Sequence, residues 1–536
     1  MALTGAIRDK LHEIISDIRG RKPLEIVLAL AVLIQFAFIA YVNLFTIDEV
    51  LDNDMAKLFV HIAEMWRTKS VLIPGWIYTT TVEIDCPAII AVFLYGITDN
   101  IYLSSGISNI VFLILYLYII HELAQCAGFS RGAGLLAMLA VMIPYSFGQL
   151  LYFNLMFFGG AYYCMKASVP LIAIYILVSD DPFDKRRLPV SVICLCFIFI
   201  TAFSSGVYVS VCGLLPVLMV YVLMASKTVR KSIFALISVL LSMTGILLNA
   251  RVPYEMKGLN SSLVTEDSIG ESVRSLVMCY IEMLGGLPYE DTRVMSAQGI
   301  KYVLKFALIL VITIFMIIFI FKAARSFYRA EHGIRAEIPE YIAVLILLDV
   351  FILVMTGLGT QSRYLLPSFV PLLIISAMEL WEKLIMRNGA LTGFLTVAAI
   401  LVIALLSDRD VLLGDPYPFY RTDALKYDAL DEMLAKYPDR DVVFLNDTGT
   451  TEVLRARNLN SGREYFTLMN EDGGFEDGLS VCDYYAYATD PEAISKDHIL
   501  VVNESFGDIS ELPEDMAAAY EPVDEYQIFT VYLGQR

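Results

Sequence analysis

Residues 46–87 read TIDEVLDNDMAKLFVHIAEMWRTKSVLIPGWIYTTTVEIDCP, and this polar stretch directly follows the first long apolar segment of the chain. It opens with Asp48, Glu49, Asp52 and Asp54 at the end of that segment. Charge so close to the hydrocarbon boundary is costly unless water, a partner or a cation compensates it. An amphipathic helical pattern, a loop of proline and aromatic residues, a second proline and further apolar sequence come next. This order favours a functional loop over the simpler alternative, a hydrated loop at the membrane surface.

The composition is that of a membrane protein. Hydrophobic residues make up 57% of the 536 residues, and the mean hydropathy is +0.64. Soluble domains lie well below this, so we expect a polytopic α-helical membrane protein. Residues 1–23 are polar, and the apolar run after them is long enough to span, so we expect no cleavable secretory signal. The eight cysteines lack the spacing of metal ligands or of a disulfide framework, which indicates small core residues.

The acidic residues are concentrated near the C-terminus. Residues 407–536 contain 28 Asp and Glu against 10 Lys and Arg, so they carry the whole formal net charge of −18. Such a tail is not expected to bind nucleic acid or anionic lipid. About 130 residues can form a core of their own, so we expect an accessory α/β domain that binds an acceptor or a partner. Its predicted helix and three strands lie at 424–437, 441–445, 498–502 and 527–533.

About eleven apolar segments are predicted to span the membrane. The basic clusters between them all fall on one side if residues 86–99 do not cross, because that run has only about 13 suitable positions and a span needs about 20. We therefore expect 86–99 to be a helix at the outer surface of the cell membrane, with the N-terminus inside and the C-terminal domain outside. The predicted spans are 24–45, 102–124, 132–152, 159–179, 189–204, 206–225, 232–250, 302–321, 339–357, 364–380 and 389–406.

These spans divide the chain into three predicted parts. A cytoplasmic segment at 1–23 precedes a transmembrane domain at 24–406, and an extracytoplasmic α/β domain follows at 407–536. Two outer loops of the transmembrane domain are long, at 46–101 and 251–301. In the first, residues 52–66 have an amphipathic pattern that suits a helix in the membrane interface. In the second, residues 268–284 also have an amphipathic helical pattern.

Five motifs follow one another in the first outer loop and near the end of the transmembrane domain. They are the acidic pair Asp48-Glu49, HIAEMW at 61–66, a loop with Pro74, Trp76 and Tyr78, an apolar helical run from Pro87 to Gly96, and QSRYLLPSFVP at 361–371. In order and sidedness they resemble the GT-C class of integral membrane glycosyltransferases, in particular the branch of protein mannosyltransferases and aminoarabinose transferases. The resemblance covers most of residues 24–406 in topology.

The sequence departs from that family at three places. Where the family has Lys-Pro-Pro-Leu, this chain has DCPA at 85–88, so a lysine that contacts phosphate is missing there. The arginine that usually opens the second span is absent from SSGISN at 104–109. Gln149 and Asn154 stand in place of a further acidic residue. These differences concern the donor contacts and the metal use that the resemblance implies.

The resemblance implies transfer of a sugar from a polyprenyl-phosphate donor to an acceptor glycan, lipid or protein on the outer face of the membrane. A carboxylate must then activate the acceptor hydroxyl or hold a divalent cation, such as Mg²⁺ or Mn²⁺. By position Asp48 suits the catalytic role, with Glu49 second. Asp48 and Asp54 are the candidate metal ligands.

The same chemistry needs cationic groups that stabilise the departing lipid phosphate, and an apolar groove for the polyprenyl tail. Arg363, Arg251 and Lys166 are the candidates for binding the donor phosphate, because all three lie near the outer ends of predicted spans. The simpler interpretation of Arg363 is an interfacial anchor, and that of Lys166 is a structural role.

Aromatic residues of the two motif regions are candidates for binding the substrate. Tyr78, Trp76 and Tyr364 are these candidates, and the alternative for each is a place in the aromatic belt of the membrane interface. We interpret His61 and Asp85 as structural residues.

Two other functions stay open at the level of sequence. A polysaccharide polymerase or ligase has a similar number of spans, but such enzymes usually carry working Arg and His residues in a late outer loop, and 251–301 has no His. A non-catalytic scaffold or a transporter of lipid-linked sugars is the other, although the paired broken helices of transporters are not evident. Convergence of the loop 46–101, Arg363 and the loop 251–301 on one outward-facing cavity would favour the transferase.

Overall fold

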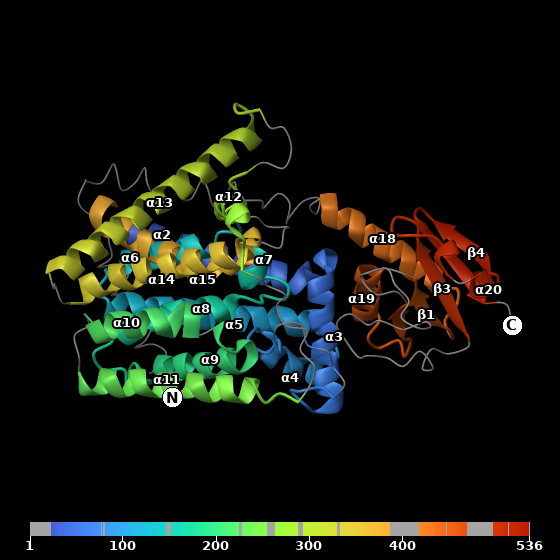
Figure 1. Ribbon diagram of the computed structural model, residues 1–536, viewed down its shortest axis with the longest axis horizontal. Coiled ribbons are helices and arrows are strands. Elements are labelled where there is room, and N and C mark those ends of the chain that lie inside the picture. The colour runs from blue at the N-terminus through green and yellow to red at the C-terminus, as the bar shows by residue number, and fades with distance from the viewer. Residues whose placement is uncertain are drawn as a thin grey trace, which may run out of the picture.

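A bundle of apolar helices and a small sheet domain make up the protein (Figure 1). The computed structural model describes residues 23–385 and 418–534 apart from internal gaps. Helix α3 (Asn53–Thr68) lies across the ends of the bundle helices, between the bundle and the C-terminal domain. The gaps are at 75, 77, 79–80, 146–151, 209, 224–227, 254–262, 288–292, 330–332, 446, 469–496 and 513.

Seven of the described helices are long and apolar enough to cross a membrane. A helix lies at each predicted span as far as residue 380, whereas the predicted span 389–406 lies outside the described residues. The polytopic α-helical class is therefore confirmed, and the number of eleven spans stays a prediction. The seven are α2 (Pro23–Phe45), α5 (Ile101–Cys126), α9 (Leu188–Ser205), α11 (Val229–Asn249), α13 (Ala297–Arg329), α14 (Ile334–Thr356) and α15 (Leu366–Leu380), the last flanked by η5 (Ser362–Leu365) and η6 (Trp381–Ile385).

Shorter elements lie between and beside these helices. With 11 residues α4 (Ala88–Thr98) rises only about 16 Å, about half the hydrocarbon thickness, which fits the prediction that 86–99 does not cross. The other short apolar helices are α6 (Arg131–Met142), α8 (Cys164–Val178) and α10 (Leu215–Leu223), which follows the π-helical turn η2 (Ser210–Leu214). The remaining ones are η1 (Ile47–Val50), α7 (Tyr152–Phe157), η3 (Glu266–Ser268), α12 (Ile269–Glu282) and η4 (Leu358–Thr360).

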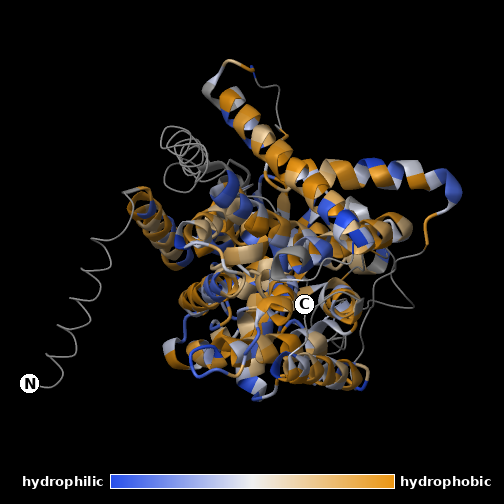
Figure 2. Ribbon diagram, turned by 90° about the vertical axis from the view of Figure 1, so that its left-hand side faces the viewer, coloured by the Kyte–Doolittle hydropathy of each residue, from blue (hydrophilic) through white to orange (hydrophobic). Residues whose placement is uncertain are grey.

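The bundle exposes large apolar side chains on its outer helices. Leu240, Met243 and Leu247 on α11 and Ile314 and Phe321 on α13 are among them. In Figure 2 hydrophobic residues cover the outward faces of the helices, and hydrophilic residues gather at loops and helix ends. So much exposed apolar surface is unfavourable in water and suits lipid.

The first two spanning helices cross at a polar contact. A Cβ atom on Gly106 of α5 would lie 2.0 Å from the backbone oxygen of Asn43 on α2, so glycine permits this close approach. Nδ2 of Asn109 donates to Oδ1 of Asn43 at 2.7 Å and to the carbonyl oxygen of Gly159 at 2.9 Å. Nδ2 of Asn43 donates to the carbonyl oxygen of Phe157 at 2.8 Å. The end of α2, where the first outer loop begins, is thus held by two other parts of the bundle.

The helix predicted at 52–66 forms as α3, and its ends follow local chemistry. The Asp52 carboxylate caps the N-terminus by accepting a hydrogen bond from the backbone N–H of Met55 at 2.8 Å. Lys69 ends the helix in a left-handed conformation, with φ of 54°.

The C-terminal domain is an α/β domain, as predicted. Its five strands are ordered β2-β1-β3-β5-β4, with β1 parallel to β2 and β3, and β5 antiparallel to β3 and β4. Helix α19 packs on α3 of the membrane part, so the two parts are in contact. The elements are α18 (Pro418–Leu434), β1 (Asp441–Phe444), α19 (Thr448–Arg457), β2 (Tyr465–Thr467), β3 (His498–Asn503), η8 (Ile509–Glu511), α20 (Glu514–Ala517), β4 (Tyr520–Tyr526) and β5 (Phe529–Gly534).

Candidate functional site

The predicted acidic pair lies at the boundary between the membrane part and the C-terminal domain. Asp48 and Glu49 are exposed on η1 and line a cavity of about 310 Å³. Partial burial, and then the neighbouring Asp48 carboxylate, raise the pKa of Glu49. The other lining residues are Tyr102 from α5, Asp428 and Asp431 from α18, and Arg457 from α19.

The charged residues that the C-terminal domain contributes to this cavity form ion pairs with one another. Arg457 donates through Nε to Asp431 at 2.8 Å and through Nη2 to Asp428. Nδ2 of Asn458 also donates to Asp431, at 2.8 Å. On the opposite wall Asp48 and Glu49 have no basic partner in the described part of the chain. The cavity is therefore acidic, and its unpaired carboxylates belong to the membrane part.

A buried ion pair joins α3 to the loop that follows it. Nζ of Lys57 is 2.5 Å from Oε1 of Glu83, and their side chains are only 5% and 9% exposed. Glu83 has a φ of 60°, in the left-handed region that non-glycine residues rarely adopt. Burial alone would raise the pKa of Glu83, but Lys57, His61 and Lys166 outweigh it and lower that pKa. A strained backbone that carries a buried carboxylate is typical of functional sites.

His61 lies one helical turn after Lys57 and faces the same carboxylate. Its Nδ1 is 4.0 Å from Oε2 of Glu83, and its ring centre is 4.9 Å from that of Trp76 and 5.8 Å from that of Tyr78. Neither ring nitrogen has a hydrogen-bond partner among the described residues. Burial lowers the pKa of His61 to about 4, although Glu83 opposes the change. Trp76 and Tyr78 are also buried, so in this structure they pack around His61 and not in an aromatic belt.

A second buried ion pair joins Asp85 to the start of α8. Nζ of Lys166 is 3.2 Å from Oδ1 of Asp85, with side chains 10% and 0% exposed. Ser204 donates to Oδ1 of Asp85 at 2.8 Å, and Ser205 donates to Oδ2 at 2.6 Å. Lys166 also donates to the carbonyl oxygen of Tyr162 at 3.3 Å. The aspartate that replaces the lysine of the family motif is thus the counter-ion of another lysine.

A third, half-exposed pair forms the outer edge of the same region. Nη1 of Arg363 is 3.9 Å from Oδ2 of Asp54, and each side chain is 39% exposed. The guanidinium group lies 5.7 Å from the ring centre of Tyr364, and Nε donates to Gln361 at 2.8 Å. The Tyr162 hydroxyl donates to the backbone oxygen of Asp54. Arg363, Tyr364 and Asp54, which the sequence analysis proposed separately, are therefore neighbours.

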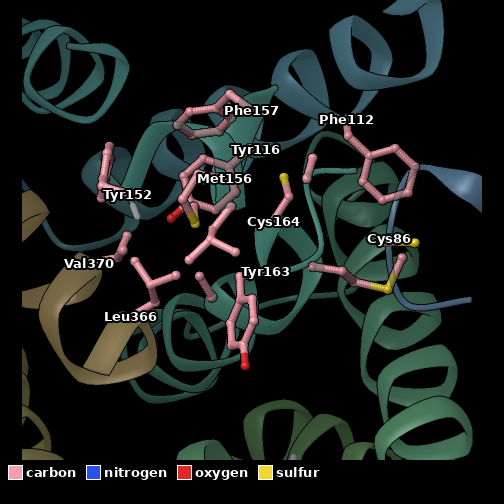
Figure 3. Close-up of a cluster of buried hydrophobic side chains, with 14 of the residues drawn as sticks. Cys86, Phe112, Tyr116, Tyr152, Met156, Phe157, Tyr163, Cys164, Leu366 and Val370 are labelled. Atoms are coloured by element: carbon pink, nitrogen blue, oxygen red, sulfur yellow. The ribbon is translucent and has the colours of Figure 1, made fainter. Parts of the chain in front are cut away.

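Tyr162 connects the outer pair with the buried one, because its hydroxyl donates to the backbone oxygen of Asp54 and its carbonyl oxygen accepts from Lys166. The next residue, Tyr163, flanks the lysine. Its ring centre is 5.2 Å from Nζ of Lys166. In Figure 3 Tyr163 lies at the edge of a buried hydrophobic cluster, and its hydroxyl points away from the other labelled side chains. The apolar cluster thus supports one side of a polar site.

Two predicted groupings do not form in the part of the chain that the structure describes. Arg251 is exposed beyond the end of α11 and shares no ion pair there with the site residues. Asp48 faces the C-terminal domain, whereas Asp54 faces Arg363. No three His, Cys, Asp or Glu side chains among the described residues lie close enough together to hold a metal ion. These residues therefore lack a complete metal site, and binding by Asp48 and Asp54 stays a prediction.

Sequence reasoning missed Lys57 and Glu83 and gave Asp85 and His61 only a structural role. A signal was present for Lys57 and His61, because residues four apart share one face of a helix. Both stand among the apolar positions of α3, where a charged residue needs a partner. No local signal could have shown which carboxylate that partner is.

The fold now places the protein in a structural class. The helical bundle, the helix across its end and the C-terminal sheet domain form a GT-C-like membrane fold. The structure that carries this comparison is that of ArnT, an aminoarabinose transferase, from Cupriavidus metallidurans in the apo state. The two match with a TM-score of 0.50 and 13% sequence identity, over 94% of this chain and 98% of ArnT. At this identity the likeness concerns the fold, and function must be argued from the site.

No family model matches the chain, and no curated protein matches it.

Proposed function

We propose that the protein is a membrane glycosyltransferase that moves a sugar from a polyprenyl-phosphate donor to an acceptor glycan, lipid or protein on the outer face of the membrane. The observation that carries the proposal is the convergence of Arg363 and Lys166 at one end of the bundle, each beside a carboxylate. The GT-C type fold supports it. Membrane orientation, with the N-terminus inside and the C-terminal domain outside, is part of the proposal and follows from the basic clusters.

The donor phosphate would bind between Arg363 and Lys166. Both residues lie at helix starts, Lys166 in the first turn of α8 and Arg363 just before α15, where the helix dipoles favour an anion. Two cations in a partly dry site stabilise the charge that develops on the leaving lipid phosphate. Tyr364 would contact the donor beside Arg363.

An apolar pocket beside α15 suits the polyprenyl tail. Leu373, Ala377 and Leu380 of α15 form one wall, and α6 and α13 supply the others. A run of isoprene units is entirely hydrocarbon and needs only apolar contact, which these side chains provide. The remaining lining residues are Leu136, Ala140, Ile143, Tyr145, Leu308, Val311, Ile312 and Ser376.

The acceptor would enter through the cavity between η1 and the C-terminal domain. Its hydroxyl oxygen attacks the anomeric carbon, the bond from that carbon to the phosphate oxygen breaks, and the lipid phosphate leaves. Asp48 accepts the hydroxyl proton, with Glu49 as the second carboxylate. Mg²⁺ or Mn²⁺ at Asp48 and Asp54 stays a prediction, and no step here depends on it.

The direct test uses the full-length protein in proteoliposomes. Polyprenyl-phosphate sugars with radiolabelled hexose, pentose or amino sugar are supplied to the outside-facing C-terminal domain, and labelled product and released polyprenyl phosphate are measured together. We expect one donor to give both products, and the Asp48→Asn variant to give neither. Release of no lipid phosphate from any donor, by a protein that is folded and correctly oriented, would reject the proposal and favour a scaffold or transporter.

A further inference from the structure

Asp85 is held more completely than a loop residue needs for its own stability. Its carboxylate is fully buried and accepts hydrogen bonds from Ser204 at 2.8 Å and Ser205 at 2.6 Å, besides the contact with Lys166. A buried carboxylate is costly unless its partners compensate the lost water. The two hydroxyl donors fix the orientation of the carboxylate, and Lys166 balances its charge.

The backbone around Asp85 is docked on the ends of two membrane helices. The N–H of Val82 donates to the carbonyl oxygen of Ser204 at 3.0 Å, and the N–H of Ile84 donates to the Ser204 hydroxyl at 3.3 Å. Nδ2 of Asn249, at the end of α11, donates to the carbonyl oxygens of Phe203 at 2.8 Å and Ser204 at 3.2 Å. The loop is therefore fastened to α9, and α9 to α11, at the level of the ion pair.

Lys166 keeps unused hydrogen-bonding capacity in this arrangement. An ammonium group has three N–H donors. Two are accounted for by the ion pair with Oδ1 of Asp85, at 3.2 Å from Nζ, and by the hydrogen bond to the carbonyl oxygen of Tyr162. In the described part of the chain the third has no acceptor, and the Tyr163 ring lies beside the lysine, with its centre 5.2 Å from Nζ. The ammonium group thus has a defined orientation and can still donate one further hydrogen bond.

We propose that Asp85 is a positioning residue that fixes the ammonium group of Lys166 for the donor phosphate, an inference that rests on the proposed function. A lysine side chain has several rotatable bonds, and holding it in one place costs rotamer entropy. Because Asp85 already holds the Lys166 side chain in place before the phosphate binds, this entropy is not lost again on binding. Asp85 also balances the buried charge of Lys166, so that the phosphate binds to an ammonium group that is already in position.

The test compares variants of the full-length protein in proteoliposomes. Asp85→Asn keeps the shape of the side chain and an oxygen acceptor for one of the two serines, while the other serine must accept from the amide NH2, and it removes the charge that holds Lys166. We expect the KM for the polyprenyl-phosphate sugar to rise about tenfold while kcat changes less, because ground-state and transition-state binding are lost together. Lys166→Met should give a similar rise. The double variant should be no worse than Lys166→Met alone, since the two residues act as one unit.

Two further variants separate positioning from a purely structural role. Asp85→Glu keeps the charge and should recover part of the donor affinity. Ser205→Ala removes one hydrogen bond from the same carboxylate but leaves the ion pair, so we expect its KM to stay within about twofold of the parent protein. Asp85→Asn with an unchanged KM but a lower melting temperature would overturn the inference. So would a double variant in which the two effects simply add.

A binding measurement distinguishes failure of this inference from failure of the proposed function. Sugar-free polyprenyl monophosphate is titrated against each variant, and binding is followed by intrinsic tryptophan fluorescence. Weaker binding in both Asp85→Asn and Lys166→Met supports the positioning role even if no sugar transfer is found. Equal binding by all variants overturns the role of Asp85, whether or not the parent protein transfers sugar.

Discussion

Charge is arranged in opposite ways on the inner face of the loop 46–101, which packs on the bundle, and on its outer face, which meets the C-terminal domain. Toward the bundle, Lys57 meets Glu83, and Lys166 meets Asp85 just beyond it, in pairs that are almost completely buried. Toward the C-terminal domain, Asp48 and Glu49 look into a cavity whose only described cation, Arg457, is already paired on the opposite wall.

The difference indicates that the buried ion pairs have a structural role, whereas the exposed carboxylates are available for chemistry. A buried charge without a partner is costly, so the inner residues are fixed in pairs and give the site its shape. An exposed carboxylate without a basic partner costs little and is free to take up a proton. The contrast predicts large chemical effects on the outer face and large stability effects on the inner face.

Removal of the outer carboxylate should have the largest effect. Asp48→Asn keeps the shape of the side chain but cannot accept the acceptor proton, so transfer should fall about 100- to 10,000-fold. Thermal stability should hardly change, because Asp48 is exposed. The measurement is sugar transfer in membranes at equal protein level, with Glu49→Gln as the milder companion. Full activity of Asp48→Asn would remove the catalytic role from the outer face.

Breaking the inner pair should mainly affect stability. Lys57→Met leaves the Glu83 carboxylate buried without its closest cation, and the free energy of unfolding should fall by about 3–5 kcal/mol. The double variant Lys57→Met/Glu83→Gln should lose less than the two single changes together. Unfolding in detergent measures both effects. Arg230→Ala, which breaks an exposed pair with Asp181, is the control and should cost no more than about 1 kcal/mol.

If Lys57→Met were as stable as the control variant, the inner pair would not be a structural support. The contrast between the two faces would then fail on its inner side.

Acid should weaken the inner face through His61. The folded protein has a pKa of about 4 for this residue against an ordinary value of 6.5, so the unfolded chain takes up a proton that the folded one does not. Stability should therefore fall as pH drops from 6.5 to 4, by about 3 kcal/mol at about 1.4 kcal/mol per pH unit. Glu83, whose pKa is lowered in the folded state, loses its own contribution only below about pH 4.5.

The His61→Gln variant should flatten the pH dependence between 6.5 and 4, and unfolding at several pH values is the measurement. An equally steep loss of stability in this variant would assign the acid sensitivity to other groups.

Arg363 is intermediate between the buried inner face and the exposed outer face, and its substitution should have the smallest effect. Its pair with Asp54 is half exposed, so Arg363→Ala should leave stability nearly unchanged and reduce donor use about 10- to 100-fold. Lysine should replace it poorly, because the guanidinium group offers a fixed bidentate fork. Donor KM and kcat are measured beside Arg67→Ala, an exposed arginine on α3, as the control. Normal donor binding by Arg363→Ala would leave Arg363 as an interfacial anchor.

The secondary-structure elements could largely be predicted from the sequence, but the ion pairs and hydrogen bonds between distant residues could not. Hydrophobic periodicity is local, so the helix at 52–66, the non-crossing run at 86–99 and three of the five described strands of the tail could be predicted, whereas β2 and β4 were missed. Lys57 and Glu83 lie 26 residues apart, and Asp85 and Ser204 lie 119 apart. Such partners depend on how the helices pack, and this packing cannot be deduced from the residue pattern of a single sequence.

The C-terminal domain shows the same limit from another side. Its own fold was predictable, but its contact with α3 was not. An isolated acidic tail gives no sign that Asp428, Asp431 and Arg457 would complete a cavity with Asp48 and Glu49. The sequence analysis selected this pair from its place after the first span, and its surroundings became known only from the structure.

The close crossing of α2 and α5 at Gly106 has a consequence for how the protein meets its membrane. Because Asn43 is bound to Asn109 and Phe157, α2 cannot slide or turn independently of the bundle. Spanning helices adapt to bilayers of different thickness by tilting. Here the whole bundle must tilt as one body, which leaves the height of Asp48 relative to Arg363 unchanged. The protein should therefore keep its activity in lipids of different chain length, as long as this polar crossing is intact.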